Sequence, residues 1–253
     1  MDVIDLRDFY GRSLGKIAQR VVRARIAEFW PSVQGLRVAG LGYATPYLRP
    51  FLGDAERVIA LMPAPQGVHH WPYDQRSLVS LVHEDQLPLA DESIDRMLLA
   101  HAVEDSESLR AMLRQVWRVM APGGRVLIVA PNRVGIWARR ETTPFAHGRP
   151  YSRTQLTSVL RDAMFSPTDW RSALYMPPFE WRPFMRTAGT WEKAGQMLGQ
   201  RFAGVILVEA VKQIYAAPPQ LPEGHLVRAR EAVRGLVPKT QRQNSRTHSA
   251  PAD

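Results

Sequence analysis

The sequence contains no cysteine. That absence excludes disulfide bonds, thiolate nucleophiles and cysteine-ligated zinc sites. The sequence also has no run of 18 uninterrupted apolar residues, so no segment is predicted to cross a membrane as a helix. Its first residues, 1–7, are charged from the second position and lack the apolar stretch of a secretory signal. We therefore expect a cytoplasmic protein without a membrane span.

Acidic residues are the scarcer charge. The chain has 33 Lys and Arg against 24 Asp and Glu, a formal net charge of +9. A basic balance can indicate nucleic acid, an anionic membrane face or an acidic partner. Here the basic residues are spread along the chain, and no basic run with interleaved aromatic residues indicates a groove for single strands. A solvated, Arg-rich surface is favoured, and nucleic acid is the weakest candidate partner.

Several catalytic signatures are also missing. The sequence has no Ser-His-Asp nucleophile elbow and no Walker phosphate loop. His69 and His70 are adjacent but have no third ligand at metal-site spacing. We therefore expect no metal site.

What is present is an alternation of strand-like and helix-like segments. Apolar strands are predicted at 37–41, 57–62, 78–83, 94–100, 125–130, 170–175 and 204–209. Helices are predicted at 14–29 with Ser13 as N-cap, at 45–52, at 107–120, and at 153–163 after the capping box formed by Ser152 and Gln155. Such alternation predicts a parallel sheet covered on both faces, with ligands bound at the carboxyl ends of its strands.

The domain organisation follows from composition. We expect one domain over 1–215, with N-terminal helices in 1–30, a long loop at 131–151 and a Pro- and Trp-rich insertion at 176–200. Residues 216–239 are interpreted as a linker and a short helix, and the polar tail 240–253 as disordered.

The order of motifs over 36–130 resembles the class I S-adenosylmethionine (SAM)-dependent methyltransferases of the methyltransferase-11 type. Residues 87–95 look like the Leu-Pro-Phe-x-Asp-x-Ser-Phe-Asp element of that family, 101–104 match its His-x-x-Glu segment, and 114–129 follow its helix, Pro-Gly-Gly and fifth-strand pattern. The resemblance implies a Rossmann-like α/β fold, with a mostly parallel seven-stranded sheet, helices on both faces and an antiparallel last strand. It also implies SAM as the cofactor.

The family's glycine loop is only partly kept. Gly42 keeps the turn, whereas Gly40 stands where the family has an acid for the amino-acid end of SAM. Ala44 and Pro46 take the second and third glycine positions. The resemblance implies that Gly40, Gly42 and Tyr43 lie at the cofactor, although the Tyr43 ring could instead fill the space that SAM needs.

The rest of the implied cofactor site is also altered. Met62 stands where the family has an acid for the ribose hydroxyls, and Met offers no useful hydrogen bond there. Each charged hydrogen bond is worth roughly 1.5–3 kcal/mol, so losing both acids could weaken SAM binding by a factor of hundreds or more. Asp85 or Glu84, ahead of Leu87, could still meet the adenine amino group, as the acid after the family's third strand does.

Candidate substrate-side residues follow the fourth and fifth strands. His101 could act as a general base or serve as a structural histidine, and Glu104 lies three residues on. The loop 131–151 is interpreted as a lid that lies across the carboxyl ends of the first and fourth strands. It would hold an anionic substrate or a partner, because Arg forks suit carboxylate or phosphate. The alternative is an ordinary surface loop. Its candidate binding residues are Asn132, Arg139, Arg140, His147 and Arg149.

Two functions are weighed. The first is a SAM-dependent methyltransferase acting on a small, anionic molecule by aligning its nucleophile with the methyl group. The second is a pseudo-methyltransferase that keeps the fold as a binding or regulatory subunit, with a protein partner or as a homodimer. The altered positions 40, 46 and 62 motivate the second function.

Overall fold

The computed structural model describes residues 1–180, 187–198 and 202–213. The linker, short helix and tail expected at 216–253 lie outside the described residues.

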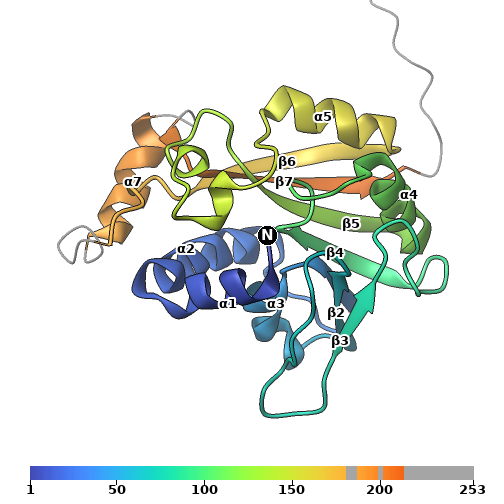
Figure 1. The fold of residues 1–253 in the computed structure, drawn as a ribbon. Helices are drawn as coiled ribbons and strands as arrows, with labels where there is room; N and C mark the ends of the chain where they lie inside the picture. Colours follow the sequence, from blue (N-terminus) through green and yellow to red (C-terminus); the bar gives the residue numbers. More distant parts are fainter. Residues whose placement is uncertain (181–186, 199–201, 214–253) are drawn as a thin grey trace, which may run out of the picture. The chain divides into compact units, whose positions relative to one another are not determined.

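One sheet of seven strands forms the centre of the domain, in the order β3-β2-β1-β4-β5-β7-β6 (Figure 1). The strands are β1 (Arg37–Gly42), β2 (Arg57–Pro63), β3 (Val79–Val82), β4 (Ile94–Ala100), β5 (Met120–Pro131), β6 (Phe165–Ala173) and β7 (Val205–Lys212). β1 to β5 pair in parallel, and β7 runs antiparallel to both β5 and β6. The predicted fold class is confirmed.

The helices largely follow the predicted pattern. They are α1 (Val3–Gly11), α2 (Ser13–Phe29), α3 (Thr45–Leu48), α4 (Leu109–Val119), α5 (Arg153–Asp162) and α7 (Ala188–Leu198), with 3-10 turns η1 (Arg49–Leu52), η2 (Trp137–Arg139) and η3 (Pro144–Ala146). The Ser152–Gln155 capping box is present in full. Ser13, however, begins α2 rather than capping it, and the cap residue Arg12 makes no side-chain cap bond.

Two strands differ most from their predicted bounds. β5 begins at Met120, before the predicted Pro-Gly-Gly break, because Met120 already pairs with Ile94 of β4 ahead of a register shift. β6 covers 165–173 rather than 170–175, because it pairs with β7 from Lys212 back to Val205. In both cases a neighbouring strand sets the length of the element, which local propensity alone does not encode.

The two faces of the sheet bury separate cores. Alternate strand residues, such as Met62 and Leu98, pack with α1, α2 and α3. Their neighbours in the chain, such as Leu61 and Leu99, pack with α4 and α5 on the opposite face. This alternation follows from the two-residue period of a strand.

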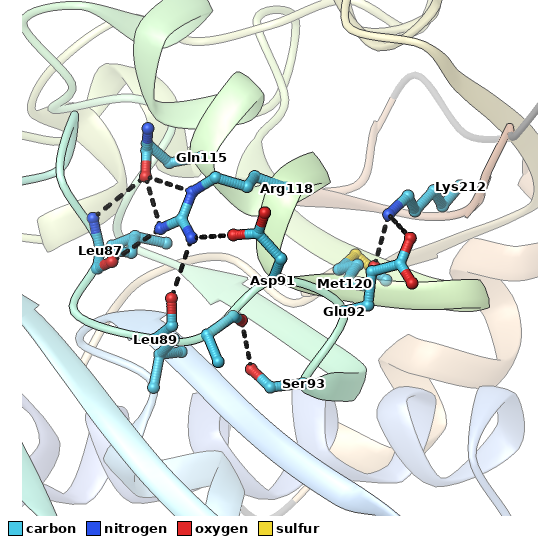
Figure 2. Close-up of polar contacts among 10 residues, drawn as sticks. Leu87, Leu89, Asp91, Glu92, Ser93, Gln115, Arg118, Met120 and Lys212 are labelled. Carbon is cyan, nitrogen blue, oxygen red and sulfur yellow. Dashed lines mark hydrogen bonds and ion pairs between the residues drawn. The ribbon is translucent and has the colours of Figure 1, made fainter.

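The segment 87–95 is held in place by one arginine of α4. The Arg118 guanidinium donates to the backbone oxygens of Leu87 (2.8 Å) and Leu89 (2.9 Å) and pairs with Asp91 at 2.5 Å (Figure 2). Gln115, one turn earlier, accepts from the Leu87 amide at 3.3 Å. This family-like motif therefore fastens the loop before β4 to α4, which is a structural role.

Candidate active site

A cleft lies at the carboxyl ends of the parallel strands, where α1 packs over the sheet. A cavity of about 230 Å³ opens there, which we call the β2–β4 cavity. Its lining includes Pro63 at the end of β2 and Gln66 after it, His83 and Asp85 after β3, and His101 and Asp105 after β4. The position is the one expected for a ligand in an open parallel sheet.

The two glycines of the loop have different roles. Gly42 has a φ of +82°, and a side chain there would come within 2.4 Å of the Ala100 backbone oxygen, so it lets β1 turn tightly against β4. Gly40 lies inside β1, where a Cβ would meet Ala44 Cβ at 2.6 Å and Leu48 Cδ1 at 2.7 Å. The place of the family's acid is thus filled from the start of α3.

Met62, expected to face the ribose, is fully buried in the core beneath α1 and α3. It is the penultimate residue of β2, and its side chain follows the alternation that directs it into this core. The β2 residue that lines the β2–β4 cavity is its neighbour Pro63. The structure therefore differs from the sequence interpretation at this position.

The acids after β3 take separate roles. Glu84 accepts hydrogen bonds from the Ser106 hydroxyl (2.9 Å) and the Ser108 amide (2.8 Å), and so holds the segment that leads into α4. Asp85 is exposed and lines the β2–β4 cavity. Leu87 is buried in the core against α4 and does not line that cavity.

His101 is the centre of a buried chain of polar groups. Its Nε2 lies 2.8 Å from the Tyr10 hydroxyl, which lies 2.7 Å from the Tyr47 hydroxyl. On the other side its Nδ1 lies 3.2 Å from a Glu104 carboxylate whose side chain is 1% exposed and whose oxygens make no hydrogen bond within the described residues. His101 also has a φ of +49°, the kind of backbone strain that clusters at functional sites.

Burial favours the neutral form of the tyrosines that bond in line with His101. Burial, together with Tyr47, raises the pKa of Tyr10 well above its ordinary value, so Tyr10 remains a neutral phenol. Glu104 beside Nδ1 favours a proton on that nitrogen, which leaves Nε2 as the acceptor. His101 is therefore oriented by a carboxylate and presents Nε2 to Tyr10, as a general base and its orienting group would be arranged.

Aromatic side chains from α1 cover the glycine loop. The Tyr10 ring stacks on Tyr43 with centroids 5.7 Å apart, and both residues are at least 90% buried. Burial also raises the pKa of Tyr43. Tyr43 thus packs against α1 in the space next to the glycine loop, the alternative that the sequence left open.

The loop 131–151 packs on the segment after β4. The Tyr151 hydroxyl donates to the Val103 oxygen (3.1 Å), the Arg149 amide donates to the Glu104 oxygen (2.9 Å), and the Phe145 ring lies 5.0 Å from His101. We predicted that it would also lie across the end of β1, but α1 lies against Tyr43 there. The loop meets α1 instead, through Phe145 and Phe9.

The candidate binding residues of this loop do not converge on one point. Asn132 is buried and donates to the Ala203 oxygen at 2.8 Å. Arg139, Arg140, His147 and Arg149 have exposed side chains. Arg140 lies 4.6 Å above the Phe179 ring, and His147 contacts the Glu141 oxygen at 3.2 Å. The three arginines form a dispersed positive surface rather than a single clamp.

Sequence reasoning missed Tyr10 and Tyr47, the two tyrosines that bond in line with His101. Tyr10 belongs to α1, whose signal was available: Asp2 caps the helix, and the buried residues Val3, Leu6 and Phe9 recur at helical spacing. Nothing local connects Tyr10 to His101, which is 91 residues away.

Within the described residues, no group of three His, Asp or Glu side chains could hold a metal ion. No described helix is long and apolar enough to cross a membrane.

Comparison with known proteins gives a consistent result. Residues 38–128 match the family model of a methyltransferase domain. The chain is 33% identical over 86 residues to a probable S-adenosylmethionine-dependent methyltransferase of Mycolicibacterium smegmatis, a match covering 33% of each protein. It therefore spans about a third of the length of that relative.

Solved structures share the fold over a longer stretch. A SAM-dependent methyltransferase from Thermotoga maritima superposes with a TM-score of 0.59 and 16% identity, covering 83% of this chain and 96% of the other. A methyltransferase of Haloferax volcanii, solved with its activator Trm112, gives 0.57 and 21%, covering 83% and 98%. At these identities the likeness shows the fold. Together with the match of residues 38–128 to the methyltransferase-domain model, the comparisons show that this chain has the fold of class I SAM-dependent methyltransferases.

Proposed function

We propose that the protein is a SAM-dependent methyltransferase that acts on a small, anionic molecule. The observation that carries this proposal is the β2–β4 cavity, which lies at the carboxyl ends of three parallel strands and beside the oriented His101. The matching relatives are named as methyltransferases, and they lend no support to a pseudo-methyltransferase.

The residues of this cavity fit the adenosine end of the cofactor. Asp85 offers a carboxylate, and the buried Gln66 Oε1 has no hydrogen-bond partner within the described residues. The cavity of about 230 Å³ is smaller than the roughly 300–1,000 Å³ of sites for drug-sized ligands. Binding of the whole cofactor therefore requires this cavity to widen toward the glycine loop. When bound, SAM supplies an electrophilic methyl group.

The chain's own contribution to catalysis is orientation and proton removal. Glu104 holds the His101 ring and would stabilise the imidazolium that forms when Nε2 accepts a proton. Tyr10 stays protonated and bonds to Nε2, so it can pass a proton to His101 only as it takes one from the acceptor. The buried, water-poor surroundings strengthen these interactions.

The exposed arginines of the loop 131–151 support an anionic acceptor through their field rather than through contact. Arg139, Arg140 and Arg149 add three positive charges beside the cleft, which raises the association rate of an anion at low salt. Replacing all three with Ala is expected to slow that association and to leave the melting temperature nearly unchanged, because exposed arginines contribute little to folding. Unfolding of the triple variant would instead make these arginines structural.

Calorimetry with SAM and S-adenosylhomocysteine tests the function. We expect micromolar affinity for both, reduced about tenfold or more by Asp85→Asn. Asp162→Asn, an exposed acid on α5, is the matched control and should bind like the unmodified protein. No binding at millimolar ligand would refute the proposal. If SAM binds but no methyl group is transferred to any of a panel of small acids, a regulatory subunit would be favoured. Light scattering would then show whether the protein is a homodimer or binds a partner.

A further inference from the structure

A second cavity of about 260 Å³ lies on the other side of Tyr10 and is not used by the proposed cofactor site. It is an open cavity lined by α1, the glycine loop, α3 and the segment 69–73, and we call it the α1–α3 cavity. Its lining includes Arg7, Tyr43, Arg49, His69, Trp71 and Tyr73.

The walls of this cavity are largely aromatic. The His69 ring lies 5.3 Å from the Tyr43 ring and 6.2 Å from the Tyr73 ring, measured between centroids. Trp71 is 4% exposed, whereas Tyr73 at the rim is 65% exposed. Ring faces at these separations offer offset and edge-on contacts to another flat group.

The charged side chains that line the cavity are both arginines. Arg7 and Arg49 line it, and each has its nearest acid, Asp8 or Asp74, 3.7 Å away. All four side chains are more than half exposed, so these pairs are weak and leave the guanidinium groups open to a ligand. No carboxylate is among the lining residues.

His69 adds a hydrogen-bonding atom without a partner. Its Nε2 lies 3.4 Å from the Thr45 hydroxyl, while its Nδ1 is buried and makes no hydrogen bond within the described residues. Burial is the largest cause that lowers the pKa of His69, and Arg7 lowers it further, so the ring is neutral near pH 7. Buried polar atoms are normally satisfied, and this one is not satisfied within the described residues.

We propose that the α1–α3 cavity binds a single-ring aromatic anion. The aromatic walls suit a flat ring, and the two arginines suit a carboxylate or a phosphate. An apolar protein cavity of about 150 Å³ is enough for benzene, so one substituted ring fits in size.

This ligand is assigned as the methyl acceptor, an assignment that rests on the proposed function. Tyr10 lines the α1–α3 cavity, and its hydroxyl bonds at 2.8 Å to His101, which lines the β2–β4 cavity. The two cavities therefore meet at the Tyr10–His101 pair, where a proton released by the acceptor can be taken up. Binding of the aromatic anion itself does not depend on SAM.

The experiment is a titration of the full chain at low salt with four probes: benzoate, phenyl phosphate, benzamide and acetate. We expect benzoate or phenyl phosphate to bind at least tenfold more tightly than benzamide, which has no charge, and than acetate, which has no ring. The two anionic arms distinguish a carboxylate site from a phosphate site. Equal binding of benzoate and benzamide, or binding of none of the probes, overturns the proposal.

Variants locate the site. The double variant Arg7→Gln, Arg49→Gln should lose about tenfold or more in affinity for the anionic probe. Arg161→Gln, an exposed arginine of α5, is the control and should bind normally. An unchanged double variant, or an equal loss in the control, places the anion elsewhere and overturns the proposal.

The same titration with and without S-adenosylhomocysteine separates the two proposals. If the protein binds the aromatic anion but does not bind SAM, the α1–α3 cavity remains a binding site for the anion, but the anion is not a methyl acceptor. If the protein binds SAM but none of the aromatic probes, the proposed anion site is wrong and the methyltransferase proposal is unaffected.

Discussion

Gly40→Ala tests whether Ala44 and Leu48 fill the space beside position 40, where the family has an acidic side chain. An added Cβ would come within 2.6 Å of Ala44 Cβ and 2.7 Å of Leu48 Cδ1, about 1 Å inside ordinary van der Waals contact. Both neighbours are fully buried, so neither can swing into solvent. Overpacking of this kind costs roughly 1–3 kcal/mol, because side chains and backbone must shift to relieve it.

The assay is thermal unfolding followed by circular dichroism. For a domain of this size, about 1 kcal/mol corresponds to roughly 2–4 °C, so the melting temperature should fall by roughly 2–12 °C. Gly53→Ala is the matched control, because a Cβ there meets nothing within 4 Å and its φ is −89°. We expect the control to melt within about 1 °C of the unmodified protein or slightly above it.

Gly40→Asp extends the test to the cofactor. It restores the acid of the family but places a carboxylate against α3, so it should destabilise more than Gly40→Ala and should not tighten SAM binding. The reasoning is refuted if Gly40→Ala melts like the Gly53→Ala control. It is also refuted if Gly40→Asp is stable and binds SAM more tightly, because position 40 would then face the cofactor.

Three further substitutions test the core, the scaffold and the buried polar chain. Met62→Asp buries an unpaired carboxylate and should cost about 4 kcal/mol or more in thermal unfolding; tighter SAM binding at unchanged stability would contradict this. Arg118→Leu removes two hydrogen bonds to backbone oxygens and should lower the free energy of unfolding by about 2–4 kcal/mol. The control Arg161→Leu should change it little. Equal melting temperatures of the two variants would mean that Arg118 does not hold the loop before β4 against α4. Tyr10→Phe leaves His101 Nε2 without its donor and should cost about 1–3 kcal/mol, and an unchanged melting temperature would mean that the chain of polar groups is not formed.

Much of the fold could be predicted because the relevant signals are local. The short apolar runs of the strands and the helical spacing in α2 and α4 predicted seven strands and the main helices. The Ser152–Gln155 capping box formed as predicted, since its two hydrogen bonds join residues three apart. Element ends were less predictable. β5 and β6 owe their bounds to pairing with β4 and β7, which lie far away in the sequence.

The candidate site was only partly predictable for the same reason. The sequence by itself determined that the loops after β1, β2, β3 and β4 meet at one edge, because parallel strands must end together. It also singled out His101 and Glu104. Only the tertiary structure decided that Gly40 faces α3, that Met62 points into the core and that Tyr10 of α1 bonds to His101. Those outcomes depend on how α1 and α3 pack on the sheet, a long-range arrangement that no local pattern of residues specifies.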